Sequence, residues 1–270
     1  MDNLNKENVI KLFELYMKVT DVPRLGPSEI GEEKLRDKKL GIINGSSWIT
    51  LWSNYFGSKI LPEVKLVNVG NEGVQLNFME AHEKGLPTPP EININKFSSY
   101  ARDLVELVEV DAILISCSTM NRSYPEVEKA VKSEEIPVVP IDLPMMEKAV
   151  KRGGRVLVIA THGPTVESTR KLLEETAERM NKKIKISGAT VEKAFDLLGK
   201  GKIKEHNQLI TDAIQEAKKK EEINTVVLAQ LSMTVFKLSY PDAENKFGAK
   251  VLTSGEEGFK RVREILLDSE

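Results

Sequence analysis

The feature that most constrains the fold is an internal repeat, in which one order of patterns occurs twice along the chain. AILISCSTM at 112–120 precedes PVVPID at 137–142, with a Tyr-Pro pair between them. VVLAQLSM at 226–233 precedes AKVLTS at 249–254, again with a Tyr-Pro pair between them. This duplicated order predicts two similar lobes. Chance similarity between two unrelated strand–helix units is the alternative.

A second pair of segments repeats a hydrophobic strand that runs into a small, hydroxyl-rich turn. These segments are LGIINGSSW at 40–48 and VLVIATHGPT at 156–165. Short apolar runs that alternate with amphipathic stretches are typical of strand–helix units around a mainly parallel sheet. We therefore predict an α/β protein with two pseudo-symmetric lobes. Eight strands are expected, at 40–43, 64–69, 112–116, 138–141, 155–160, 183–186, 225–229 and 250–252.

The lobes are expected to follow an N-terminal extension. Residues 3–19 place apolar side chains near helical spacing, and Pro23 and Pro27 then stop the run. The C-terminal strand and helix echo residues 137–152, so we expect the chain to return to the first lobe at its end. The predicted division is an N-terminal helical extension (1–36), lobe 1 (37–150 plus 246–270) and lobe 2 (151–245).

Charge and composition exclude several classes of protein. Lys and Arg number 39 and Asp and Glu 41, a net charge of −2, so no basic field favours nucleic acid as a partner. The first ten residues are polar, and no apolar run approaches the roughly 18 residues that span a bilayer, so we expect a cytoplasmic protein without a membrane partner. The sequence leaves the oligomeric state open, a homo-oligomer included.

Small polar residues gather where four predicted strands end. Because these ends share one edge of a parallel sheet, and helix N-termini there offer unpaired N–H groups, we expect a small carboxylate as ligand. The alternative for each residue is that it caps its own helix. The candidate substrate-binding residues are Asn44, Ser46, Ser47, Ser118, Thr119, Asn121, Thr161, Thr165 and Ser232.

Cys117 is the only cysteine, which excludes an intrachain disulfide and a multi-thiolate metal site. It stands at the end of a predicted strand and before a helix start, where backbone donors favour the thiolate and make it a usable base or nucleophile. The alternative is a buried structural cysteine. His162 is a candidate second acid or base, or else a surface histidine in a turn.

Three segments together resemble a known family. SCSTMN at 116–121, ATHGPT at 160–165 and VVLAQLSM at 226–233 are similar, in order and spacing, to segments of the aspartate/glutamate racemase superfamily, which also contains hydantoin racemases, maleate isomerases and arylmalonate decarboxylases. The resemblance covers about residues 38–270. It implies an active-site cleft between the two lobes and no metal, pyridoxal or nucleotide cofactor. In the racemases, one thiol from each lobe works on opposite faces of the substrate's α-carbon.

The resemblance carries over to individual residues only in part. Cys117 matches the first family thiol and Thr119 the carboxylate-holding threonine, whereas Ser118 stands where Asn is usual. The position of the second thiol falls at Gln230, and a glutamine cannot abstract a proton near neutral pH. We therefore predict that the chain is not a standard two-cysteine racemase.

Several reactions stay open for such a chain. We predict a cofactor-independent racemase/isomerase-family enzyme that acts on a small carboxylate or amino-acid-like substrate through the thiol of Cys117, with Cys117, His162 and Gln230 as catalytic candidates. Decarboxylation of a substituted malonate-like acid, with reprotonation by the thiol, is one alternative. Addition of the thiol to a double bond or carbonyl, with Gln230 as an amide donor, is another. A non-catalytic anion-binding protein is the competing class. A serine or threonine hydrolase is a third possibility, but this sequence lacks the G-x-S-x-G nucleophile elbow.

Overall fold

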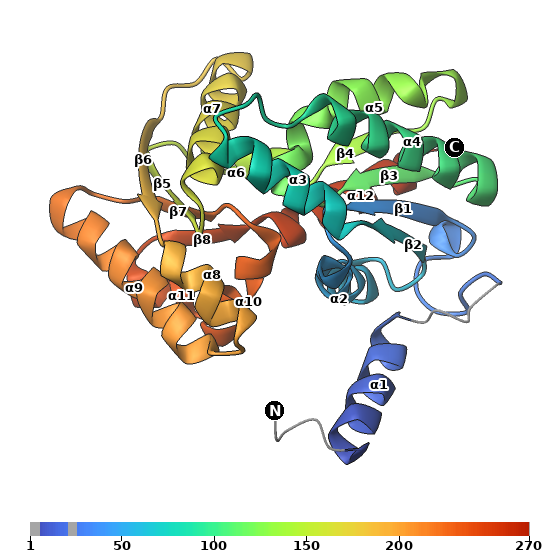
Figure 1. Cartoon of the computed structure of the whole chain (residues 1–270), viewed down its shortest axis with the longest axis horizontal. Coiled ribbons are helices and arrows are strands. Elements are labelled where there is room, and N and C mark those ends of the chain that lie inside the picture. Colours follow the sequence, from blue (N-terminus) through green and yellow to red (C-terminus); the bar gives the residue numbers. More distant parts are fainter. Residues whose placement is uncertain (1–5, 21–25, 270) are drawn as a thin grey trace.

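The chain forms two four-stranded parallel sheets, each flanked by helices, in a computed structural model that describes residues 6–20 and 26–269 (Figure 1). The strand orders are β2-β1-β3-β4 and β6-β5-β7-β8, so the duplicated sequence corresponds to a duplicated topology. The predicted two-lobed α/β fold is confirmed. The strands are β1 (Lys39–Asn44), β2 (Lys65–Gly70), β3 (Ala112–Ile115), β4 (Val138–Pro140), β5 (Arg155–Ala160), β6 (Lys185–Thr190), β7 (Thr225–Leu228) and β8 (Lys250–Thr253).

Helices cover both faces of each sheet because the central strands are apolar on both faces. In β3, Leu114 packs in the hydrophobic cluster on one face, and Ile113 and Ile115 pack in the cluster on the other. This alternation follows from the two-residue period of a strand. The helices are α1 (Lys6–Thr20), α2 (Thr50–Ile60), α3 (Glu72–Glu83), α4 (Glu91–Val108), α5 (Tyr124–Ala130), α6 (Asp142–Arg152), α7 (Gly163–Arg179), α8 (Glu192–Gly199), α9 (Ile203–Lys220), α10 (Thr234–Ser239), α11 (Ala243–Phe247) and α12 (Ser254–Asp268).

All eight predicted strands form, and one of them is displaced along the chain. The sixth was expected at 183–186 and lies at Lys185–Thr190. The residues in its second half, 188–190, are small, which is not typical of a strand, but Gly188 lets the strand lie close to α7. A Cβ at this position would lie 2.7 Å from Cγ1 of Val166. The close approach between strand and helix explains why the strand continues through these small residues.

The last helix of each repeat crosses to the other lobe. Helix α6 follows β4, but its Met145 and Met146 pack in the core of the second lobe with Val158. Helix α12 follows β8, but its Phe259 packs in the core of the first lobe with Leu40. The two exchanged helices pack against each other, so they join the lobes.

This exchange divides the chain differently from the predicted boundaries. Strand β8, expected in lobe 1, is hydrogen-bonded to β7 in the second sheet, and only α12 after it lies against the first lobe. Helix α6, also expected in lobe 1, buries its apolar face in the second lobe. The echo between 137–152 and the C-terminus therefore reflects equivalent elements of the two repeats, because β4 and β8 each end their own sheet.

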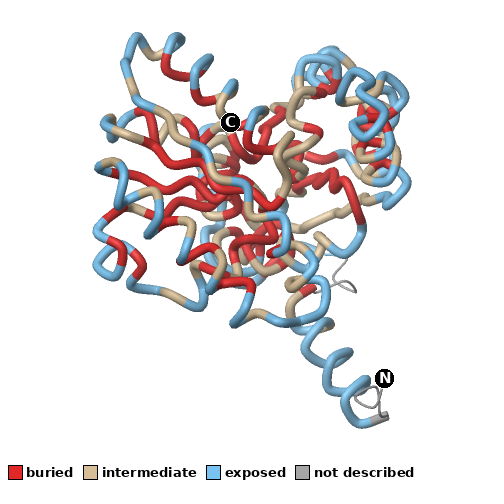
Figure 2. The backbone as a smooth tube through the Cα atoms, turned by 60° about the vertical axis from the view of Figure 1, so that its left-hand side comes forward, coloured by how far each residue is buried: buried red, intermediate tan, exposed pale blue. Residues whose placement is uncertain are grey.

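The N-terminal helix α1 projects from the body, and mainly its C-terminal end contacts it (Figures 1 and 2). Ser58 on α2 donates a hydrogen bond of 3.1 Å to the carbonyl of Val19. The helix predicted at 3–19 is thus found at Lys6–Thr20, whereas residues 3–5 and Pro23 lie outside the described residues. Within the described ranges, no helix has the length and apolar character needed to cross a membrane.

Candidate active site

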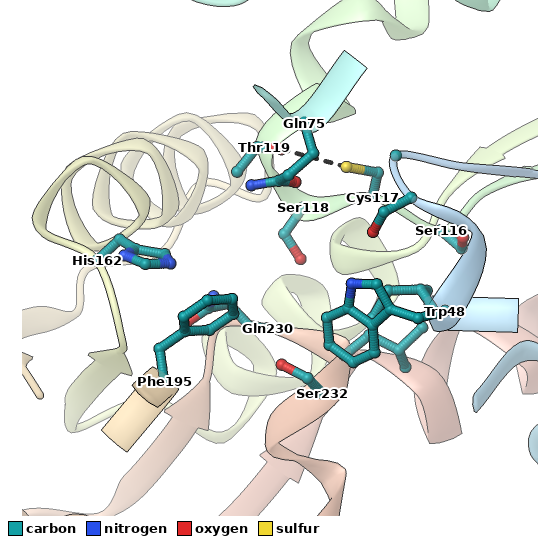
Figure 3. Close-up of a pocket in the computed structure, with 14 residues that line it drawn as sticks. Trp48, Gln75, Ser116, Cys117, Ser118, Thr119, His162, Phe195, Gln230 and Ser232 are labelled. Carbon is teal, nitrogen blue, oxygen red and sulfur yellow. Dashed lines mark hydrogen bonds between the residues drawn. The ribbon is translucent and has the colours of Figure 1, made fainter. Parts of the chain in front are cut away.

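A small cavity of about 80 Å³ lies where the carboxyl ends of the two sheets meet (Figure 3). In each sheet the strand order reverses between the first and third strands of the repeat, and ligands of open α/β sheets bind outside such a point. Both of these points border the same cavity. The residues that line it are Gly45, Ser46, Trp48, Ile49, Gln75, Ser116, Cys117, Ser118, Thr119, His162, Phe195, Gln230, Leu231 and Ser232.

Cys117 enters the cavity from the end of β3. It precedes the 3-10 turn Ser118–Ser123, and its Sγ shares a hydrogen bond of 3.2 Å with Oγ1 of Thr119. The thiol lies against the backbone of Gly45, where a Cβ would be only 2.3 Å from Sγ. Glycine at 45 is therefore what leaves room for the thiol.

The environment of Cys117 raises the pKa of its thiol above the ordinary value. The main cause is burial, to which the negative charge of Asp142 adds, while the Thr119 hydroxyl and two backbone N–H groups act in the opposite direction. The side chain keeps partial exposure toward the cavity, yet protein atoms surround the sulfur. The expectation of a thiolate is wrong, because desolvation outweighs the backbone donors. Near neutral pH the group is a protonated thiol.

Gln230 faces the cavity from the second lobe, at the end of β7. Its Oε1 accepts two hydrogen bonds from Thr161, one from the backbone N–H at 2.6 Å and one from the hydroxyl at 2.8 Å. A backbone N–H can only donate, so it fixes which end of the amide is oxygen. The NH₂ group is thus the end that Gln230 can offer to a ligand. As expected from the sequence, Cys117 and Gln230 border one cavity from different lobes.

His162 closes one side of the cavity at the N-terminus of α7. Its ring contacts that of Phe195, with the centroids 4.9 Å apart. Burial lowers the pKa of His162 below its ordinary value, although Glu192 and Asp196 act in the opposite direction. The imidazole is therefore neutral near pH 7, which is the form that accepts a proton.

The structure brings seven of the twelve predicted site residues to the cavity, and five lie elsewhere. Asn44 is buried under the turn, where it accepts a hydrogen bond from Ser53 and donates one to Asn68. The backbone N–H of Ser47 donates to Glu72 on the surface. The other three hold neighbouring structure: Asn121 donates to Asp142, Thr161 holds Gln230, and Thr165 is buried in the first turn of α7. The seven that line the cavity are Ser46, Cys117, Ser118, Thr119, His162, Gln230 and Ser232.

Six side chains of the cavity were not predicted as site residues: Trp48, Ile49, Gln75, Ser116, Phe195 and Leu231. Gln75 from α3 and Phe195 from α8 reach the cavity although their sequence surroundings carry no local signal. Trp48 is 48% exposed and lies at the cavity (Figure 3). Its position directly after the first hydroxyl-rich turn was the signal that could have found it.

Asp142 is a further residue that sequence reasoning missed. It begins α6 and is 3% exposed, and its carboxylate accepts hydrogen bonds from Ser118 at 3.2 Å and from Asn121. Burial raises the pKa of Asp142 to about 7, while those hydrogen bonds oppose the shift. A second cavity, of about 350 Å³, is lined by both Ser118 and Asp142. The place of Asp142 at the end of the repeated PVVPID segment was the signal that could have identified it.

This carboxyl gives a test of stability against pH. Its pKa is about 7 in the folded state against 3.8 as the ordinary value, so between pH 4 and 7 the folded state keeps a proton that the unfolded state has lost. Stability therefore falls as the pH rises through this range, by up to about 4 kcal/mol from this group. Asp142→Asn should remove that fall. Urea unfolding of the wild type and of Asp142→Asn at pH 4.5 and 8 checks this. If the free energies of unfolding of the two proteins differed by the same amount at both pH values, the prediction would be contradicted.

No three His, Cys, Asp or Glu side chains gather into a metal site within residues 6–20 and 26–269. None of the described residues around the first cavity is a lysine or an arginine. What the cavity offers a ligand is therefore neutral: hydroxyl groups, amide groups, one thiol and one imidazole. Such a set suits a carboxylate held by hydrogen bonds, together with proton transfer by the thiol or the imidazole.

Comparisons with known proteins give one family. The sequence model of the Asp/Glu/Hydantoin racemase family matches residues 93–262. A search of curated proteins found no match. Similar structures include an aspartate racemase homologue from Pyrococcus horikoshii (20% identity, 86% of this chain and 100% of that chain, TM-score 0.65). Another is glutamate racemase from Francisella tularensis in complex with D-glutamate (16% identity, 86% of this chain and 81% of that chain, TM-score 0.62). A third is allantoin racemase from Klebsiella pneumoniae (15% identity, 85% of this chain and 88% of that chain, TM-score 0.58). At these identities the likeness concerns the fold.

Proposed function

Because this chain belongs to the Asp/Glu/hydantoin racemase family, we propose that it is a cofactor-independent enzyme that moves a proton at one face of a carbon next to a carboxylate. Cys117 is the proton-carrying group. The observation that carries the proposal is the pairing of a thiol from the first lobe with a fixed amide donor, Gln230, from the second.

The neutral donors of the cavity suit the charge that develops in such a reaction. Removal of the proton, or loss of a carboxyl group, leaves an electron pair on the α-carbon that spreads onto the remaining carboxylate oxygens as an enediolate. The NH₂ group of Gln230 and the hydroxyls of Ser46 and Ser232 border the cavity from both lobes. Donors that are already in place stabilise that charge without reorganising, and each is worth roughly 10² to 10³ in rate.

The protonated state of Cys117 favours a particular direction for the first proton transfer. A thiol with a raised pKa is a proton donor near pH 7. Decarboxylation of a malonate-like acid needs such a donor: the C–C bond breaks, CO₂ leaves, and the electron pair left on the α-carbon takes the thiol proton. The thiolate then regains a proton from water. This makes the decarboxylase the second candidate, beside racemase or isomerase chemistry in which His162 would act as the other base.

Trp48 and Phe195 bear on the substrate as well. They place two aromatic rings at the cavity, one from each lobe (Figure 3). Aromatic walls favour a substituent that is flat or apolar. We therefore include aryl- and alkyl-substituted acids among the candidate substrates, beside amino acids and hydantoins.

Proton NMR in D₂O on single enantiomers of amino acids, hydroxy acids, hydantoins and substituted malonates tests the proposed function. We expect deuterium at the α-carbon with one configuration only, because one face carries the thiol and the other an amide. Exchange with inversion would contradict one-face transfer and would direct attention to His162. Binding of a carboxylate without exchange or turnover would instead support the non-catalytic anion-binding protein.

A further inference from the structure

A buried carboxylate joins the turn that carries Cys117 to the second lobe. Asp142 accepts a hydrogen bond from the Ser118 hydroxyl, 3.2 Å from Oδ1, and another from the Asn121 side chain at Oδ2. These donors are the first and fourth residues of the 3-10 turn Ser118–Ser123. A six-residue 3-10 turn is long for its kind and has weak internal hydrogen bonds, so side-chain contacts decide how firmly it is held.

The other end of this connection lies in the second lobe. Asp142 is the first residue of α6, and α6 buries Met145, Met146 and Val150 in the core of the second lobe. A shift of one lobe against the other would therefore pull directly on the turn after Cys117. Gln230, the amide donor opposite the thiol, belongs to that same second lobe.

We propose that Asp142 is a positioning residue that ties the Cys117 turn to α6 and so aligns the thiol with Gln230. The role in turnover rests on the proposed function, but the alignment of the thiol does not. The Asp142 side chain is not among those that line the first cavity, so it acts through Ser118, which borders both cavities.

Electrostatics give this role a readout that a merely structural residue would not move. The negative charge of Asp142 is one of the causes that raise the pKa of the Cys117 thiol. The charged groups that share the second cavity with Asp142 are Arg122, Glu175 and Arg179. The uncharged side chain of Ser254, on α12, faces the Asp142 carboxyl group. Arg122 is ion-paired with Glu175, and Arg179 is ion-paired with Glu147 outside this cavity.

The decisive experiment is the pH dependence of iodoacetamide alkylation of Cys117, the only thiol of the chain, from pH 6 to 11. In Asp142→Asn the midpoint should move to lower pH, because a negative charge near the sulfur is gone. Ser118→Ala keeps that charge and removes one hydrogen bond to the turn, so its midpoint should not fall. Glu257→Gln is the matched control, since Glu257 is a buried carboxylate on α12 that pairs with Lys148 at 2.7 Å. Its midpoint should equal that of the wild type.

Turnover then separates this proposal from the proposed function. With a substrate from the NMR panel, we expect kcat to fall at least tenfold in both Asp142→Asn and Ser118→Ala, and to stay unchanged in Glu257→Gln. An unshifted alkylation midpoint in a folded Asp142→Asn protein would overturn the proposal. Full activity in both Asp142→Asn and Ser118→Ala would also overturn it. If no substrate is found, the proposed function fails, whereas the alkylation result still decides the role of Asp142.

Discussion

Replacing Cys117 by alanine should lower turnover by about 10³-fold or more, since general acid–base groups contribute roughly 10² to 10⁴ in rate and no second thiol exists in the chain. The measurement is α-deuteration or CO₂ release with the best substrate of the panel. Cys117→Ser should lose nearly as much, because an alcohol is a far weaker acid than a thiol and its alkoxide does not form near neutral pH.

The variants must keep the fold for this result to carry weight. The alanine variant lacks one sulfur atom, on a side chain that is partly exposed to the cavity. The free energy of unfolding should therefore change by no more than about 1 to 2 kcal/mol. Carboxylate binding, measured by calorimetry, should persist in Cys117→Ala because the hydroxyl and amide donors are untouched. Retention of more than a tenth of the activity would remove the thiol from the mechanism and leave His162 as the group to examine.

The repeat made the fold predictable because strands are a local property of the sequence. Runs such as those at 155–160 and 225–229 are apolar on both faces, which is what a central parallel strand requires. The exchange of α6 and α12 could not be predicted in the same way. An amphipathic helix specifies that one face is buried, and nothing in its own residues says which of two similar lobes will cover that face.

The site was predictable only where its residues follow strands. Cys117, His162 and Gln230 each stand just after a strand end, and the shared edge of parallel sheets brings them together. Gln75 and Phe195 come from helices α3 and α8, and their approach to the cavity depends on the tertiary packing of those helices. Single-residue patterns contain no information about such distances.

The acidity of Cys117 was predicted in the wrong direction for an identifiable reason. The residue does precede a turn whose N–H groups favour the thiolate, and these groups do lower its pKa. The larger effect is burial, with a smaller one from Asp142, which lies 25 residues further along the chain. Desolvation by distant segments outweighed a local motif that had been read correctly.

Gln230→Glu should lower kcat/KM by about 10² to 10³-fold, the usual effect of removing one donor to a developing negative charge. The side chain keeps its size, and Thr161 can still donate both hydrogen bonds to one of its oxygens. The other oxygen takes the place of the NH₂ group, so a donor becomes an acceptor that carries charge and repels the substrate carboxylate. Steady-state kinetics between pH 5 and 8 measure the effect, and activity should recover partly at low pH as the new carboxyl is protonated.

Thr161→Val supplies the graded comparison for Gln230. It removes the hydroxyl hydrogen bond of 2.8 Å and keeps the backbone one of 2.6 Å, so the amide stays in its orientation but is held less firmly. The loss should be about twofold to tenfold, since one neutral hydrogen bond contributes roughly 0.5 to 1.5 kcal/mol. If Thr161→Val cost as much as Gln230→Glu, the effect would lie in the packing of the turn. If neither variant lost activity, the amide would not face the charge, and the second lobe would contribute to the reaction through His162 instead.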